Sequence, residues 1–165
     1  MTMPALDKLH FVAVTQHDPL AAPLLAELAF EYATRYDSTE ERVMKWLLEE
    51  YPAEDFTPPD GALLVGLLDG VPVTGGAFRR FDDTRAELKR VWTDSRYRQR
   101  GYAKAILAEL EREIAARGYR RVYLTTGDRQ PEAEALYLSA GYTRLDGPLP
   151  AAVDGYPIAF EKKLS

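Results

Sequence analysis

The chain has 165 residues, of which 46% are apolar and 28% charged, a composition typical of one globular domain and unlike disordered or collagen-like chains. It contains no cysteine, which excludes disulfides, thiolate metal sites and cysteine nucleophiles, and its net charge of −5 argues against nucleic acid or an anionic membrane as partner. There is neither a basic leader before an apolar run nor an apolar stretch of 18 residues. We therefore expect a single domain over residues 1–165, in a soluble cytoplasmic protein.

The N-terminal third predicts one strand followed by two helices. Residues 10–14 alternate weakly and indicate a strand, and the leucines of residues 19–36 recur at helical spacing. Ser38, with Glu41 three residues later, forms a capping-box pattern that opens a second helix, which is expected to end at Tyr51.

From Gly61 onward the apolar pattern changes to that of strands. Two strands joined by Asp69-Gly70 indicate a hairpin. The elements expected after this hairpin are a strand 86–93, a helix 101–117, a strand 121–126, a helix 131–140, and strands 142–145 and 158–163. This order predicts an α/β (α+β) fold, with one mixed, mostly antiparallel sheet of about six to seven strands flanked by about four helices.

Charge is unevenly distributed along the chain. Residues 1–78 hold 13 acids and 4 bases, whereas residues 79–104 hold 9 bases and 4 acids. The basic stretch includes a strand-to-helix junction, Arg98-Gln99-Arg100-Gly101-Tyr102-Ala103-Lys104. A helix N-terminus presents unpaired N–H groups and the positive end of the helix dipole. A glycine there lets a ligand approach the backbone closely, and basic residues add positive charge, so the junction favours the binding of a phosphate group. A solvated charged face is the alternative, and the glycine motifs of P-loop and dinucleotide-binding proteins are both missing.

The junction resembles the acetyl-CoA motif Gln/Arg-x-x-Gly-x-Gly/Ala of the GNAT superfamily of N-acetyltransferases. Residues 130–142 are similar to that family's Asn-x-x-Ala-x-x-Leu-Tyr-x-x-x-Gly-Phe/Tyr, except that Gln130 stands at the frequent Asn. Strands 87–93 and 160–164 also lie where the family has its fourth and final strands. The resemblance covers about residues 8–164 and implies a GNAT-like fold and direct transfer of an acetyl group from acetyl-CoA to a primary amine.

The resemblance also implies a binding site for acetyl-CoA. The junction amides would hold the pyrophosphate, and the backbone of the fourth strand would hold the pantetheine arm where this strand separates from the fifth. An amide near Val91 would stabilise the oxyanion of the attacked thioester. The implied cofactor-binding residues are Val91, Trp92, Thr93, Arg98, Gln99, Arg100, Gly101, Tyr102, Ala103, Lys104 and Gln130.

Two side chains are implied in catalysis. Glu87 stands where histone-type members carry a carboxylate and would act as general base through water, although it could instead pair with Arg85 or Lys89 on the strand surface. Tyr137 matches the tyrosine that protonates the departing thiolate in the family. A phenol with a pKa of about 10 is protonated at neutral pH. The alternative for Tyr137 is a half-buried packing residue.

The acceptor is less well determined by the sequence. In the resembled family, the first two helices and their loops form the acceptor wall, which here implies Tyr32, Arg35, Tyr36 and the loop 52–60, with a solvated helix end as the alternative. The acidic bias of residues 1–78 would suit a cationic acceptor, a small-molecule or peptide amine. His10 and His17 have no second ligand at metal-binding spacing, so we expect no metal site.

Two further expectations concern partners and activity. The C-terminal edge strand could pair with a second copy in a homodimer. The alternative function is a non-catalytic acyl-CoA-binding or sensory module of the same fold, in which Tyr137 and Glu87 would both point away from the thioester.

Overall fold

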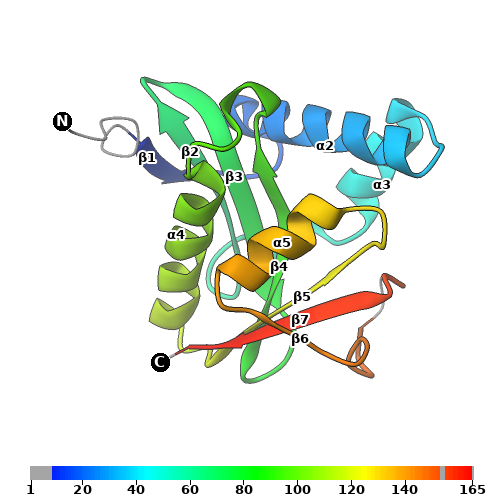
Figure 1. The fold of residues 1–165 in the computed structure, drawn as a ribbon. Coiled ribbons are helices and arrows are strands. Elements are labelled where there is room, and N and C mark those ends of the chain that lie inside the picture. Colours follow the sequence, from blue (N-terminus) through cyan, green and yellow to red (C-terminus); the bar gives the residue numbers. More distant parts are fainter. Residues whose placement is uncertain (1–8, 153–154, 165) are drawn as a thin grey trace.

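The computed structural model describes residues 9–152 and 155–164 and contains one seven-stranded sheet (Figure 1). The strand order is β1-β2-β3-β4-β5-β7-β6, and every neighbouring pair is antiparallel except the parallel pair β4 and β5. The strands are β1 (Leu9–Ala13), β2 (Ala62–Leu68), β3 (Val71–Arg80), β4 (Arg85–Thr93), β5 (Arg121–Thr126), β6 (Thr143–Arg144) and β7 (Ile158–Lys163).

Four α-helices and three short 3₁₀ turns complete the described fold. They are η1 (Pro19–Ala21), α2 (Ala22–Arg35), α3 (Glu40–Glu49), η2 (Ala53–Phe56), η3 (Ser95–Tyr97), α4 (Tyr102–Ala116) and α5 (Pro131–Ser139). The sheet separates two cores, because consecutive residues of a strand point to opposite faces. In β3, Ala77 belongs to the core under α2 and α3, whereas Phe78 belongs to the core under α4 and α5.

The predicted fold class and element order are confirmed, with small shifts at the helix starts. The first helix begins as the 3₁₀ turn η1, where the Asp18 side chain accepts a hydrogen bond from the Leu20 N–H at 2.8 Å. The N-cap predicted at Ser38 was wrong by one residue, because the residue that caps α3 is Thr39, whose Oγ1 accepts a hydrogen bond from the Arg42 N–H at 3.2 Å. Ser38 instead ends α2, since its N–H donates to the Ala33 carbonyl at 2.9 Å.

The strands β4 and β5 are joined over only part of their length. Their ladder comprises three pairs, from Arg85↔Arg121 to Glu87↔Tyr123. Beyond Glu87, β4 remains paired with β3 up to Thr93, but its other edge no longer pairs with β5. This separation leaves backbone hydrogen-bonding groups of β4 facing an opening in the sheet.

Candidate active site

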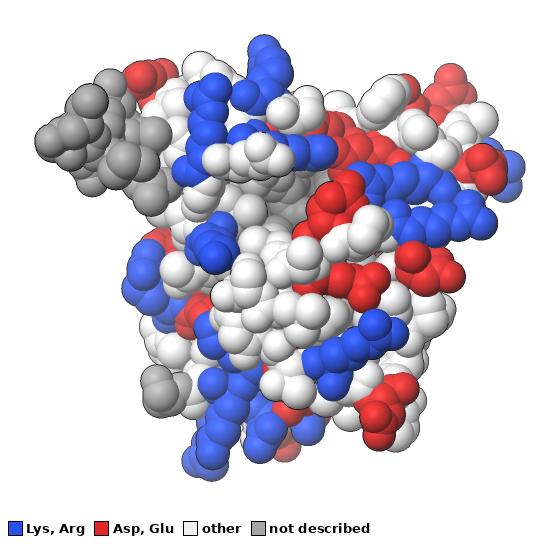
Figure 2. Space-filling view, viewed as in Figure 1, with Lys and Arg blue, Asp and Glu red and all other residues white. Residues whose placement is uncertain are grey.

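A cavity of about 450 Å³ lies where β4 and β5 separate, lined by residues of α2, α5 and the loop that begins α4. Acidic and basic side chains lie side by side around a hollow on this face (Figure 2). Thirteen residues predicted for the site line the cavity: Tyr32, Arg35, Val91, Trp92, Thr93, Arg98, Gln99, Gly101, Tyr102, Ala103, Lys104, Gln130 and Tyr137. The structure therefore brings most of the predicted residues together, whereas Glu87, Arg100 and Tyr36 do not line this cavity.

The loop before α4 presents backbone N–H groups to the cavity. Gln99 and Gly101 have φ values of 63° and 86°, both in the left-handed region. The first backbone hydrogen bond of α4 is donated by the Ala105 N–H to the Gly101 carbonyl, at 3.0 Å. Within residues 9–152 and 155–164, no hydrogen bond is donated by the four N–H groups of residues 101–104. Together with the helix dipole, these groups form a site suited to an anion.

The open edge of β4 presents the backbone of alternate residues. The Asp94 N–H donates to the Val73 carbonyl at 2.8 Å, and the Trp92 carbonyl accepts from Thr74 Oγ1 at 2.7 Å, so the backbones of Trp92 and Asp94 are directed toward β3. Because hydrogen-bonding groups alternate along a strand, those of Val91 and Thr93 face the opening. The indole of Trp92 packs in the core under α2 and α3.

Tyr137 lies on α5 with its ring buried at the end of the cavity. The ring packs against those of Tyr142 and Phe160, with centroids 5.6 and 5.8 Å away. In the described part of the chain its hydroxyl makes no hydrogen bond. Burial raises the pKa of Tyr137 well above that of an ordinary phenol, with a further contribution from Tyr32, so the hydroxyl holds its proton at neutral pH.

Glu87 occupies a different position from Tyr137. Its carboxylate is buried, 3.0 Å from the Arg79 guanidinium and 3.8 Å from the Lys89 ammonium. Arg79 also binds Asp55 at 3.0 Å, so Glu87 belongs to a chain of ion pairs. The sequence suggested Arg85 or Lys89 as an ion-pair partner of Glu87. Lys89 contacts Glu87, whereas Arg85 binds Asp82 and Glu161 instead.

A smaller cavity of about 70 Å³ adjoins the first and shares Tyr32, Gln130 and Tyr137 with it. Sequence reasoning missed the other polar and aromatic residues of its wall, which are Trp46, Glu50, Lys89, Arg90, Thr125, Thr126 and Tyr156. Lys89 and Arg90 carried a signal as members of the basic stretch 79–104, and Thr125 and Thr126 did so because they stand at the end of a predicted strand. The loop 52–60 does not line either cavity, and part of it lines a separate hollow with Arg79 and Arg80.

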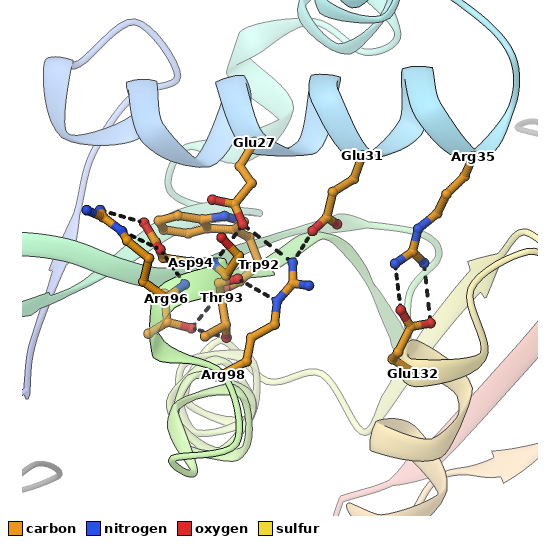
Figure 3. Close-up of polar contacts among 11 residues, drawn as sticks. Glu27, Glu31, Arg35, Trp92, Thr93, Asp94, Arg96, Arg98 and Glu132 are labelled. Carbon is orange, nitrogen blue, oxygen red and sulfur yellow. Dashed lines mark hydrogen bonds and ion pairs between the residues drawn. The ribbon is translucent and has the colours of Figure 1, made fainter.

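Arg98 extends from the loop before α4 toward two carboxylates of α2 (Figure 3). Its guanidinium pairs with Glu31 and lies 3.4 Å from Glu27, and its Nε donates to the Thr93 carbonyl at 3.3 Å. Burial raises the pKa of Glu27, while the Ser95 N–H opposes this shift. Two acidic residues of the N-terminal part, Glu27 and Glu31, therefore meet the basic stretch here.

The predicted acceptor residues of α2 make contacts with other elements. Arg35 binds Glu132 on α5 at 2.6 Å and so bridges two walls of the larger cavity (Figure 3). Tyr36 fills the space beside Gly127, where an added Cβ would lie 1.8 Å from its hydroxyl oxygen. Tyr32 lines both cavities, and burial raises the pKa of its phenol, against the effects of Gln130 and Lys89.

No helix within residues 9–152 and 155–164 is long and apolar enough to span a bilayer. The same ranges contain no cluster of three or more histidine, aspartate or glutamate side chains that could hold a metal ion.

This fold occurs in many known structures, including those of two acetyltransferases. An N-acetyltransferase named PaiA from Thermoplasma acidophilum, solved with coenzyme A, has a TM-score of 0.73 and 18% identity over 94% of this chain and 99% of its own. A GNAT family acetyltransferase from Elizabethkingia anophelis, solved with acetyl-CoA bound, has a TM-score of 0.66 and 16% identity over 96% and 99%. At these identities the similarity establishes the fold alone.

Sequence comparison identifies the family. Human N-acetyltransferase 8 is 33% identical over 81 residues, which are 49% of this chain and only 34% of that protein. Residues 24–142 match the model of the acetyltransferase (GNAT) family. This match spans both the strand-to-helix junction and the segment containing Tyr137 from which the resemblance was drawn. The chain therefore belongs to the acetyltransferase (GNAT) family.

Proposed function

We propose that this chain transfers the acetyl group of acetyl-CoA directly to a primary amine while both are bound. The observation that carries the proposal is that one cavity is lined by three complementary features. These are the N–H groups of residues 101–104, the open edge of β4, and the hydroxyl of Tyr137. The ligands named for the two structurally similar proteins support the choice of cofactor.

The residues present fit coenzyme A. The amides of residues 101–104 would bind its pyrophosphate, with Lys104 and Arg100 supplying nearby charge. The open backbone groups of Val91 and the N–H of Thr93 would pair with the amides of the pantetheine arm as a neighbouring strand does. Arg98 is a weaker candidate for a phosphate contact than the sequence implied, because two carboxylates already offset its charge.

Acetyl-CoA supplies an activated acyl group as its thioester. The neutral amine attacks the carbonyl carbon, so that the C–N bond forms and the C–S bond breaks. The Val91 N–H faces the opening and would stabilise the charge that develops on the carbonyl oxygen. Tyr137 would give its proton to the departing sulfur, and the amine would lose one proton to water or a base.

Glu87 remains our proposed base, acting at a distance. Its carboxylate lies outside both cavities, but Lys89, 3.8 Å away, lines the smaller one. A proton from the amine would therefore reach Glu87 through water rather than directly. The smaller cavity, which adjoins Tyr137, is the proposed place of the acceptor amine.

Two measurements test the proposal. Acetyl-CoA should raise the midpoint of thermal unfolding, because a ligand that binds only the folded state stabilises it. Since the chain has no cysteine, CoA released with a panel of amines can be followed by a thiol reagent without background from the protein. An absence of stabilisation would refute cofactor binding, and binding without transfer to any amine would favour the non-catalytic alternative.

A further inference from the structure

We infer that Arg90 is a positioning residue for acyl transfer, whose buried guanidinium holds a bulge of β4 in the form that turns the Val91 N–H into the opening. The inference rests on the proposed function, in which that N–H stabilises the thioester oxygen. The role inferred for Arg90 is exerted through the backbone of β4 and not by its side chain on the reacting atoms.

The bulge decides which edge of β4 the Val91 backbone faces. Before the bulge, Phe81 and Arg85 form a hydrogen-bonded pair, in which the Phe81 N–H donates to the Arg85 carbonyl at 3.0 Å. Hydrogen-bonded pairs recur at every second residue of this register, so that Ala77↔Lys89 is also one of them. Regular pairing from there would place Val91 in a hydrogen-bonded pair facing β3. The ladder instead resumes at Gly75↔Trp92, one residue later, which directs the Val91 groups to the open edge.

The extra residue is accommodated by a left-handed backbone at Arg90. Its φ is 59°, a conformation that is unfavourable for a long side chain and persists only where surrounding contacts enforce it. Asparagine, aspartate and glycine adopt this conformation more readily. An arginine at this position therefore requires that its side-chain contacts offset the strain.

The Arg90 side chain makes such contacts with three segments. Its Nη1 donates to Gln16 Oε1 at 2.8 Å, and its Nη2 donates to the Leu47 carbonyl of α3. The guanidinium carbon lies 4.6 Å from the centre of the Phe56 ring. With the residue 7% exposed, these contacts tie the bulge to the loop before η1, to α3 and to η2.

The burial of Arg90 makes these contacts necessary. Desolvation lowers the pKa of its guanidinium, an effect that Glu50 opposes. Its Nε is buried and makes no hydrogen bond to any residue described in the structure. A buried charge held by a few directional bonds has few alternative positions, so the side chain fixes the backbone to which it is attached. The same contacts connect the bulge to the wall of the smaller cavity, which Leu47 and Arg90 both line.

The test compares Arg90→Lys and Arg90→Met with Arg85→Lys. Arg85 lies on the same strand and binds Asp82 and Glu161 away from the opening, so its replacement is a matched control. The probe reaction is hydrolysis of acetyl-CoA without amine, in which water attacks the same carbonyl carbon and releases acetate and CoA thiol. We expect kcat to fall about tenfold for Arg90→Lys and about a hundredfold for Arg90→Met, with KM changed less than twofold, as for loss of an oxyanion donor. For Arg85→Lys, both kcat and KM should stay within twofold of the wild-type values.

Two further measurements include a readout that does not depend on the reaction. Hydrogen exchange of the Val91 amide, followed by NMR, should be slower in Arg90→Met than in Arg85→Lys under conditions where the two have equal global stability, because regular pairing with β3 would give this N–H a hydrogen bond that it lacks in the bulge. Adding Gln16→Glu to Arg90→Lys should restore part of kcat and of the fast exchange of the Val91 amide, because a carboxylate can pair with the shorter ammonium.

The outcomes are distinguishable. Unchanged kcat and unchanged Val91 exchange in both folded Arg90 variants would overturn the inference, as would an equal loss in the Arg85 control. If Arg90→Met does not fold, Arg90→Lys with and without Gln16→Glu gives the same comparison. If the wild type binds no acetyl-CoA, the proposed function fails, and the exchange measurement alone decides whether Arg90 holds the bulge.

Discussion

Tyr137 is a phenol whose surroundings keep it neutral. Its ring is packed among Tyr142 and Phe160, while its hydroxyl forms no hydrogen bond with a described residue. Burial raises its pKa, which makes the proton available at any pH near neutral but also makes the phenolate a poor base. This chemistry suits a proton donor.

Replacement of Tyr137 by phenylalanine tests the donor role. We expect kcat for amine acetylation to fall by about a hundredfold, the loss typical for a general acid, while the Kd for acetyl-CoA changes little because the ring is preserved. Stopped-flow thiol release and calorimetry measure the two quantities. Unaltered kcat would leave Tyr137 as a packing residue only.

Gly101 is required at the start of α4 for its backbone conformation. Its φ is 86°, and its N–H lies among those proposed to bind pyrophosphate. Gly101→Ala should cost roughly 1 kcal/mol of folding free energy through left-handed strain and should weaken acetyl-CoA binding at least tenfold.

Gly118→Ala provides the matched control. Gly118 has a φ of 93° and open space around an added Cβ, so it carries the same kind of strain away from the cavity. Its stability loss in urea unfolding should resemble that of Gly101→Ala, while its affinity for acetyl-CoA should equal that of the wild type. Equal affinities in all three proteins would rule out a cofactor contact at Gly101.

At the scale of elements, the start of α3 depends on one side chain. Thr39 is extended and its Oγ1 accepts the Arg42 N–H, whereas the Ser38 N–H is used by the end of α2. We expect Thr39→Ala to lower the free energy of unfolding by about 1 kcal/mol and Ser38→Ala to change it by much less. Urea unfolding of both variants measures the difference, and a larger effect at Ser38 would restore the cap predicted from sequence.

The contact of α2 with the loop before α4 links two elements across the cavity. Glu31 pairs with Arg98, while Glu27 accepts the Ser95 N–H at 2.8 Å (Figure 3). Both carboxylates oppose an anionic ligand, and the Arg98 guanidinium is directed to them rather than to the amides of residues 101–104.

Glu31→Gln should therefore strengthen acetyl-CoA binding. We expect the Kd to fall about twofold to fivefold at low ionic strength, the range of a partly exposed ion pair, and the effect to diminish as salt screens the charges. Glu109→Gln removes the same charge from a pair with Arg112 on α4 and serves as control. Weaker binding in Glu31→Gln would mean that the pair serves to hold Arg98 in place.

At the scale of the whole molecule, the cores contain phenols that resist ionisation. Burial raises the pKa of Tyr137 and Tyr142, and in Tyr142 the neighbouring Glu111 adds to the effect. Because these pKa values are higher in the folded chain than in the unfolded one, the stability that they contribute is fully present below the ordinary tyrosine pKa of about 10 and is lost as pH rises above it.

Alkaline unfolding tests this expectation. The free energy of unfolding, measured in urea, should fall as pH is raised from about 9 to 11, and the fall should be smaller in Tyr142→Phe, which has one buried phenol fewer. Absorbance near 295 nm follows the ionised phenols in parallel. The same slope in both proteins would show that Tyr142 does not contribute.

The order of the elements, the hairpin at Asp69-Gly70 and the strand-to-helix junction could all be predicted from the amino-acid sequence, because periodicity and turn chemistry act over a few residues. It also contained the motifs that resemble the family. These signals were sufficient for the fold class and for most residues of the larger cavity.

Which charged side chains meet depends on the tertiary fold and could not be predicted from the sequence. Arg98 pairs with Glu31, 67 positions away, so the acidic and basic parts of the chain offset each other's charge at this contact. Glu87 likewise lies against Arg79 outside the cavities, and Arg90 adopts a left-handed bulge that no local preference predicts. The physical reason is that packing across the sheet fixes these contacts, and it can offset backbone strain and desolvation that local sequence alone disfavours.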